Sequence, residues 1–244
     1  MAYGLPMSFS NGVENKQEPR IIMRGYQEGE GTLMAKAISR VNIQRYIMLS
    51  ATQTPAMEEA WMEQAATLKD DCTWAICIAQ DSSDELGTPI GSTGLHRIED
   101  GRAHSGIVIY DDSFWHQGIA SACHRARSLY AHQVLGIRAV DSYVISGNDA
   151  SLNALQGVGY TRTGTQYSHS IVGGKVCHVD NLTWVNPYRH QWDYFWGIMS
   201  LPRSLISRAV KQNWLLSEPE QMSPLCDDWY VIAWGQVFTW PHLL

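Results

Sequence analysis

The clearest change of pattern in this chain lies at residues 104–126, which read HSGIVIYDDSFWHQGIASACHRA. The first part, His104 to Tyr110, predicts a strand. From Gly118 onward, apolar and small residues recur every three or four positions, as on one face of a helix. Gly136 then ends this helix in the manner of a C′ glycine. The predicted inner face of the helix consists of Ile119, Ala122, Cys123, Ala126, Leu129 and Tyr130.

The start of this helix is a candidate phosphate site. Small residues at Gly118 and Ala120 would let a phosphate approach the backbone, where free N–H groups and the positive end of the helix dipole can bind it. A P-loop is excluded because no Gly-Lys-Ser/Thr follows, and a Rossmann fingerprint is excluded because GxGxxG is absent. The alternative is that these small residues serve only the packing of the helix on a strand.

A second informative segment is residues 145–164, which read ISGNDASLNALQGVGYTRTG. A strand is expected to end at Ile145, and Asn148 can cap the short helix that follows. Gly159 and Tyr160 then start a new strand. The chain therefore alternates strand, helix and strand after the first motif.

The segments around these two motifs predict a single sheet with helices, an α/β or α+β fold. Residues 54–69 predict a helix, because Thr54 can cap it and Pro55 occupies the first helical position. Residues 1–19 are expected to be a loose leader. Other helices are expected at residues 31–40 and 151–156, and other strands at 20–27, 73–80, 90–98, 140–145, 160–167 and 177–185.

Together these segments resemble the GNAT superfamily of N-acetyltransferases, in the branch of ribosomal-protein alanine acetyltransferases (the RimJ/RimL type). That family shows a strand of the form aEiGyvi, then wGxGxAxEA, then VxxxNxxSxxxxxxxGF. The matching runs here are residues 103–109, 115–122 and 144–160. The resemblance implies a mixed, mostly antiparallel sheet flanked by helices and splayed into a V, within a domain at residues 1–187.

The resemblance also implies a site for acetyl-CoA as the acyl donor. The pantetheine arm would pair with the backbone of Val108, Ile109 and Tyr110, as an added strand does. Asn148 would hold the pantetheine side and Asn153 the nucleotide end. The pyrophosphate would lie on the backbone amides of His116, Gln117, Gly118, Ile119, Ala120 and Ser121.

The catalytic side chains depart from the family's pattern. Many of its members carry a Glu where this chain has His104, so His104 is the candidate base. A Tyr that often protonates the thiolate is Leu155 here, and Ser151, which matches the branch motif, is the candidate acid. Either residue could instead be structural, Ser151 as a helix N-terminal residue bonded to the backbone. Tyr143 and Tyr160 are reserve candidates for the acid.

The resulting hypothesis is an acetyl-CoA-dependent N-acetyltransferase that acts on a primary amine of a small molecule or a protein N-terminus. The alternative is a GNAT-fold protein that binds CoA but has weak or no turnover, since the Glu and the Tyr are missing. A donor with a longer acyl chain is a further alternative.

The composition indicates which class of partner and which cellular compartment to expect. The 244 residues hold 18 Lys and Arg against 24 Asp and Glu, which argues against nucleic acid and suits a cationic substrate. Five scattered cysteines without a CxxC pair predict a reducing compartment, and neither a secretory signal nor a membrane span is recognisable. The pairs Cys123-His124 and Cys177-His178 lack metal-ligand spacing, so no metal is expected. The sequence thus predicts a cytoplasmic protein.

Residues 188–244 form a C-terminal extension outside the resemblance, and they hold six of the ten Trp residues. Extra core packed on the acetyltransferase domain is one interpretation, and a lid over the substrate or a homodimer interface are the others. Membrane attachment is disfavoured because the extension lacks a basic face. A helix is expected at residues 204–216 and one or two strands at 228–240.

Overall fold

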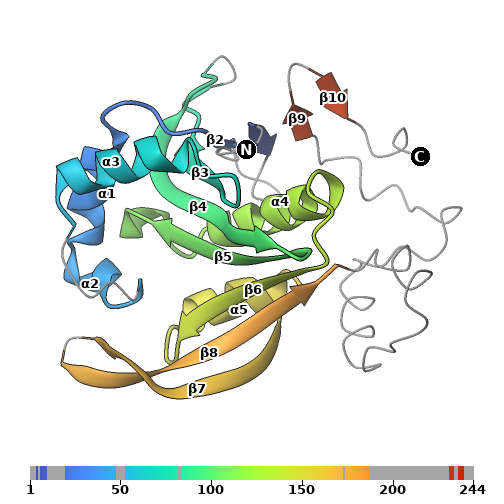
Figure 1. Ribbon diagram of the computed structural model, residues 1–244. Coiled ribbons are helices and arrows are strands. Elements are labelled where there is room, and N and C mark those ends of the chain that lie inside the picture. The colour runs from blue at the N-terminus through green and yellow to red at the C-terminus, as the bar shows by residue number, and fades with distance from the viewer. Residues whose placement is uncertain are drawn as a thin grey trace, which may run out of the picture.

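The computed structural model describes residue 4 and residues 6–9, 20–47, 53–81, 84–172 and 174–186, with two short strands further on. Its main sheet has eight strands in the order β1-β2-β3-β4-β5-β6-β8-β7, with helices on both faces (Figure 1). The strands are β1 (Met7–Phe9), β2 (Ile21–Arg24), β3 (Cys72–Ile78), β4 (Thr88–Glu99), β5 (Arg102–Ile109), β6 (Ala139–Ile145), β7 (Thr161–Val172) and β8 (Lys175–Val185). The helices are α1 (Glu30–Ile38), α2 (Val41–Gln44), α3 (Pro55–Ala65), α4 (Ile119–Gln133) and α5 (Asp149–Gly157), with a 3₁₀ turn η1 (Asp112–Phe114).

Neighbouring strands of this sheet are antiparallel, except for β5 and β6, which are parallel. Helix α4 packs on one face of the sheet, where its apolar residues join the largest core cluster. Helices α1 and α3 contribute to a second cluster together with Tyr110, at the end of β5. The predicted mixed, mostly antiparallel sheet flanked by helices is therefore confirmed.

The buried face of α4 is wider than the apolar pattern predicted. Ile119, Ala122 and Cys123 are buried as expected, but Leu129 is only half-buried. In addition, α4 buries three polar residues: His124, Arg127 and Ser128. The apolar periodicity identified the helix, but it did not identify these polar residues as part of the buried face.

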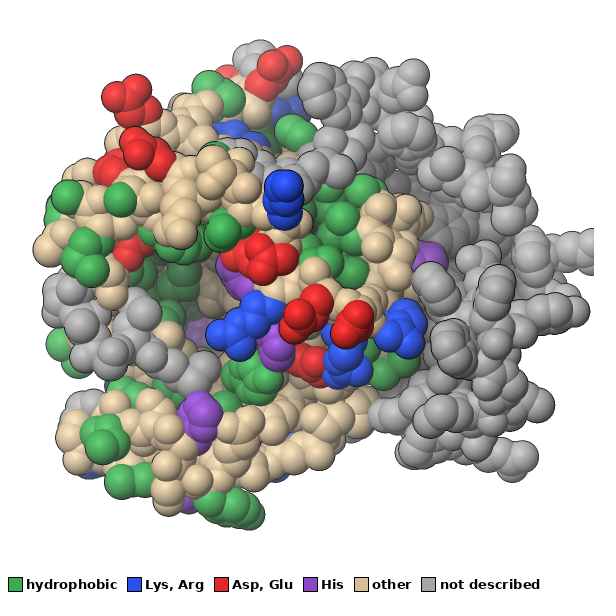
Figure 2. Space-filling view, viewed as in Figure 1, with side chains coloured by type: hydrophobic (Ala, Val, Ile, Leu, Met, Phe, Trp, Pro, Cys, Tyr) green, Lys and Arg blue, Asp and Glu red, His purple; other side chains and the backbone are tan. Residues whose placement is uncertain are grey.

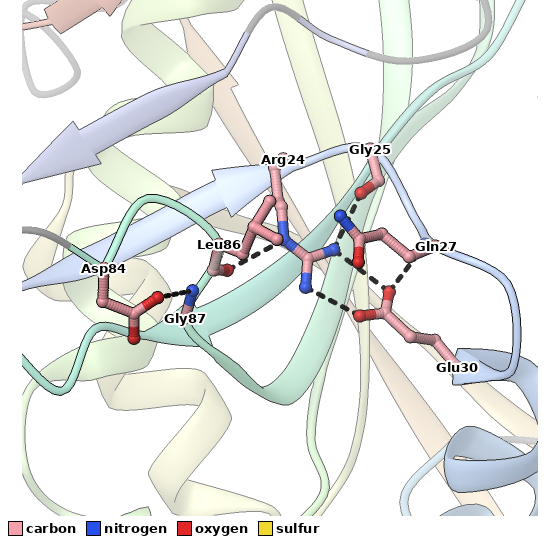
Figure 3. Close-up of polar contacts among 7 residues, drawn as sticks. All are labelled: Arg24, Gly25, Gln27, Glu30, Asp84, Leu86 and Gly87. Atoms are coloured by element: carbon pink, nitrogen blue, oxygen red, sulfur yellow. Dashed lines mark hydrogen bonds and ion pairs between the residues drawn. The ribbon is translucent and has the colours of Figure 1, made fainter.

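A buried ion pair connects β2, α1 and the turn before β4 (Figure 3). Arg24 donates to Glu30 at 2.7 Å and 3.1 Å, and its Nε donates to the Leu86 carbonyl at 2.8 Å. Glu30 also accepts the backbone N–H of Gln27 at 2.9 Å. Because α1 has no side-chain cap, this carboxylate organises the start of the helix instead.

The predictions near the two chain ends have different outcomes. The leader at residues 1–19 was expected to be loose, but Met7–Phe9 form β1, which pairs with β2. Two strands, β9 (Val231–Ala233) and β10 (Gln236–Phe238), confirm the expectation of strands at 228–240. The helix expected at 204–216 lies outside the described residues, and the domain boundary at residue 187 stays a prediction. None of the helices in the described part of the chain is long and apolar enough to cross a membrane.

Candidate functional site

The sheet opens between its two parallel strands. β5 and β6 pair from Arg102 to Ser105 on one side and from Ala139 to Ser142 on the other, and the pairing then ends. Beyond this point the two strands diverge, as the resemblance implied (Figure 1). A cleft of about 1060 Å³ lies at this divergence, lined by β4, β5, β6 and the first turns of α4 and α5. In the space-filling view the surface is hollowed between the helical side with α1 and α3 and the β7–β8 hairpin (Figure 2).

The N-terminus of α4 forms one end of this cleft. Gly118 has a left-handed backbone with φ of 79°, and His116 has φ of 59°, so the chain turns sharply into the helix. No acidic residue lies in the first turn of α4. The predicted phosphate residues that line the cleft are His116, Gly118, Ile119, Ala120 and Ser121. The site thus offers free amides and a positive dipole end without a competing carboxylate on the helix, which fits a pyrophosphate.

Two of the predicted donor-site residues have other roles. The Gln117 side chain donates to the Ser113 carbonyl at 2.6 Å and holds the loop before α4, while Gln117 is not among the described residues that line the cleft. The N–H of Tyr110 donates to the Ile90 carbonyl at 2.7 Å, and the Tyr110 side chain packs against α1. The Tyr110 amide thus already has a partner within the sheet, and backbone pairing of Tyr110 with pantetheine stays a prediction.

The remaining predicted backbone contacts do line the cleft. Val108 and Ile109 both belong to its wall. The Ile109 carbonyl accepts the indole N–H of Trp115 at 3.3 Å, which fixes the loop from β5 to α4 against the strand.

Helix α5 forms the opposite wall. Asn148 caps this helix, as predicted, by accepting the Ser151 backbone N–H at 3.3 Å. Asn148, Ser151 and Asn153 all line the cleft, which brings these three predicted residues together. Leu155, where the family often has a Tyr, is buried in the core and also lines the cleft.

His104, the base predicted from the sequence, lies beside the cleft. Its ring stacks on Tyr143 with a centroid distance of 5.4 Å. Its Nδ1 is buried and has no hydrogen-bond partner among the residues that the structure describes. Tyr143 lines the cleft, but His104 is not among the described lining residues. The structure thus gives His104 a packed position at the closed end of the V.

A histidine–carboxylate pair that was not predicted from the sequence places its histidine on the cleft wall. His96 Nδ1 is 2.7 Å from Asp71 Oδ2, and the backbone N–H of Arg97 donates to Asp71 Oδ1 at 3.0 Å. His96 lines the cleft. The signal that could have found this pair is strand register, because Cys72 faces Leu95 between β3 and β4 and the next positions along are Asp71 and His96.

A buried cation lies under the cleft. Arg127 is fully buried, and it donates to Thr93 Oγ1 at 2.5 Å, to the Gly106 carbonyl at 2.8 Å and to His124 Nδ1 at 2.7 Å. Burial, together with the Arg127 charge, lowers the pKa of His124 well below its ordinary value. His124 is therefore neutral and carries its proton on Nε2, since an arginine can only donate.

The splayed mixed sheet with a cleft at the N-terminus of α4 is the arrangement that the resemblance to N-acetyltransferases implied. Residues 20–161, more than half of the chain, match the family model described as an acetyltransferase (GNAT) domain, and the chain belongs to this family. No match was found among curated proteins.

Three solved structures illustrate the fold. Spermidine N-acetyltransferase from Vibrio cholerae, in complex with CoA and spermine, is 15% identical with a TM-score of 0.61, over 68% of this chain and 95% of its own. Ribosomal-protein-S5-alanine acetyltransferase from Vibrio fischeri is 14% identical with a TM-score of 0.58, over 71% and 96%. RimJ from Mycobacterium smegmatis, in complex with CoA-disulfide, is 13% identical with a TM-score of 0.61, over 85% and 93%. These neighbours have different acceptors, so they do not single out the RimJ/RimL branch.

Proposed function

We propose that this protein is an acetyl-CoA-dependent N-acetyltransferase that transfers an acetyl group to a primary amine by direct attack in a ternary complex. The observation that carries the proposal is that the uncapped N-terminus of α4 and the divergence of β5 from β6 share one cleft. An anion site at one end and unpaired strand edges at the other match the two ends of an acyl-CoA.

The chain's own residues would bind and orient the donor. Amides at the start of α4 hold the pyrophosphate, and the backbone of Val108 and Ile109 aligns the pantetheine arm along β5. Acetyl-CoA supplies the thioester carbonyl that the amine attacks. Ser151, on the α5 wall, is the proposed proton donor to the leaving thiolate.

The helical side of the cleft, where we place the acceptor, favours an amine attached to an apolar or aromatic group. This wall carries Tyr26 and Trp61, whose ring centroids are 5.7 Å apart, with Ile43 and Ile47 nearby on the same wall. Among the described residues that line the cleft, Asp149 is the only carboxylate. A long polycation would therefore find little charge complementarity, whereas an apolar side chain next to the amine would be buried. Both an apolar small-molecule amine and a protein N-terminus with an apolar first residue meet this condition.

A second candidate function is CoA binding without turnover. The observation in its favour is that buried Leu155 occupies the position where a proton-donating Tyr is common. Calorimetric titration with acetyl-CoA and CoA, followed by thiol release with a panel of amines, separates the two functions. Binding together with amine-dependent thiol release supports the transferase, and binding without release for any amine supports the alternative.

The first prediction concerns Gly118. Gly118→Glu is expected to lower CoA affinity by at least about 100-fold, because it places a negative charge at the pyrophosphate site and strains a left-handed residue. Calorimetry measures this affinity. Gly136→Glu is the matched control, since Gly136 is also left-handed with φ of 62° but lies beyond the other end of α4. Equal CoA affinity in the folded Gly118→Glu variant and the control would contradict the proposed site.

A further inference from the structure

We propose that His96, oriented by Asp71, is the base that takes the proton from the acceptor amine. This inference rests on the proposed acetyltransferase function and assigns its catalytic base. It replaces His104, which is packed against Tyr143, with a histidine on the cleft wall.

Three histidines line the cleft among the described residues, and their surroundings differ. His124 cannot accept a proton readily, because Arg127 donates to its Nδ1 and burial keeps its pKa low. His116 belongs to the loop that leads into α4, at the phosphate end. His96 is the histidine whose ring nitrogen contacts a carboxylate, at 2.7 Å.

The contact with Asp71 sets the tautomer of His96. A carboxylate only accepts hydrogen bonds, so Nδ1 carries the proton and Nε2 keeps a lone pair. The other oxygen of Asp71 accepts the Arg97 N–H at 3.0 Å, which fixes the carboxylate on both sides. The Asp71 side chain is 15% exposed and the His96 side chain 34% exposed, so a shielded carboxylate orients an imidazole that reaches the cleft.

Two glycines place Nε2 of His96 at the mouth of the V. Gly94 on β4 faces Gly106 on β5. A Cβ on Gly94 would lie 2.7 Å from His96 Nε2, so the imidazole lies over this glycine. A Cβ on Gly106 would have no neighbour within 4 Å, so the space there is open. Pairing of β5 with β6 ends at Ser105, one residue before Gly106, which puts this open space where the thioester is expected.

Other titratable groups surround the imidazole of His96. His104 pairs with His96 across the strands, and Tyr143 lies on β6. Arg45 and Tyr46 line the cleft from the helical side. None of these is a carboxylate, so Asp71 is the acidic partner that holds the imidazole.

The proposed reaction removes two protons from the acceptor nitrogen. His96 Nε2 accepts one proton from the acceptor ammonium, and the free amine attacks the thioester carbonyl. A C–N bond forms, the C–S bond breaks, and the electron pair of that bond leaves on sulfur. Ser151 donates its hydroxyl proton to the thiolate and takes up the second proton of the attacking nitrogen, giving the amide and the free thiol. His96 then releases its proton to water through the open cleft.

The experiment compares His96→Gln and Asp71→Asn with the parent protein, using the best amine from the thiol-release panel. We expect kcat/KM to fall by about 100-fold or more in His96→Gln and the acidic limb of its pH profile to disappear. The kcat/KM of Asp71→Asn should fall by a similar factor. The Asn amide can donate to Nδ1 and leave the proton on Nε2, so that Nε2 can no longer accept one. Calorimetric affinity for CoA should stay unchanged in both variants.

His169→Gln is the matched control, because His169 is exposed on β7 away from the cleft. An acidic limb that persists in His96→Gln would overturn the proposal, and its loss in His104→Gln instead would return the role to His104. If the parent protein binds CoA but acetylates no amine, the proposed function fails rather than the assignment of the base.

A second variant tests the position of the ring without removing it. Gly94→Ala should lower kcat/KM by about tenfold at unchanged CoA affinity, because the new methyl group displaces His96 Nε2. Gly164→Ala on β7 is its control, since the nearest atom to the new Cβ would be 4.0 Å away. Equal activity of the folded Gly94→Ala variant and this control would contradict the placement of His96.

Discussion

Single residues in this protein have properties that depend on one specific neighbour. Arg127 is a buried cation whose partners are a hydroxyl, a carbonyl and an imidazole. No carboxylate contacts it among the described residues, so its charge acts on His124 without being neutralised. Histidine is usually a pH-sensitive residue near neutrality. His124, however, is neutral and accepts a hydrogen bond from Arg127 through Nδ1.

This environment predicts a pH-dependent stability. The ordinary pKa of histidine is 6.5, and the folded protein holds that of His124 well below it. As pH falls below 6.5, the unfolded chain takes up a proton that the folded chain cannot. The free energy of unfolding should therefore be at its full value above pH 6.5 and decrease below it, by up to about 1.4 kcal/mol per pH unit. Burial also lowers the pKa of His132, which adds to the effect in the same direction.

Urea unfolding at a series of pH values between 5 and 8 measures this slope. His124→Gln should flatten it and leave the part due to other groups such as His132, whereas His169→Gln should leave it unchanged. An unaltered slope in His124→Gln would show that His124 is protonated equally in both states.

Among the elements, the connection of β2 to α1 depends on one ion pair. Arg24 and Glu30 have side chains that are only 8% and 13% exposed. A buried pair adds little by itself, but the loss of one partner leaves a charge without compensation. In this protein the pair also joins the start of α1 to the turn before β4, through Gln27 and Leu86 (Figure 3).

Glu30→Ala is therefore expected to lower the free energy of unfolding by about 3 kcal/mol, because Arg24 stays buried without its carboxylate. Glu28→Ala is the control, since Glu28 is exposed in the same turn. Urea midpoints of the two variants make the comparison. Equal midpoints would mean that water or another group compensates Arg24.

At the scale of the whole molecule, the sheet consists of two parts joined by only a short parallel pairing. One part runs from β1 to β5 and the other contains β6, β8 and β7. Four residue pairs connect them before the strands diverge. Under the proposed function, the donor would bridge the two parts with its pantetheine arm as an extra strand.

Acetyl-CoA should therefore slow amide hydrogen exchange in the peptide covering residues 106–109 and in the first turn of α4. The physical reason is that amides facing the cleft gain acceptors when the donor binds. Mass spectrometry with and without acetyl-CoA measures this change, with the β7–β8 hairpin as the internal reference. Protection confined to the hairpin would place the donor elsewhere.

Local features of this protein were predictable from the sequence. Thr54 and Asn148 cap their helices as predicted, because a cap depends on a few neighbouring residues. The motif residues also come together at the cleft as the resemblance implied, apart from His104, Gln117 and Tyr110. The amide of Tyr110 pairs with the Ile90 carbonyl in the neighbouring strand, which the local sequence pattern did not indicate.

The sequence by itself thus determined the GNAT family and the order of the elements after the leader, and it predicted a phosphate site at the start of α4. Only the tertiary structure showed that His96 lines the cleft and that His104 does not. His96 and Asp71 are 25 residues apart, and they meet because the register of β3 against β4 places them side by side. Register and burial depend on how distant segments pack, and periodicity along one segment carries no information about that.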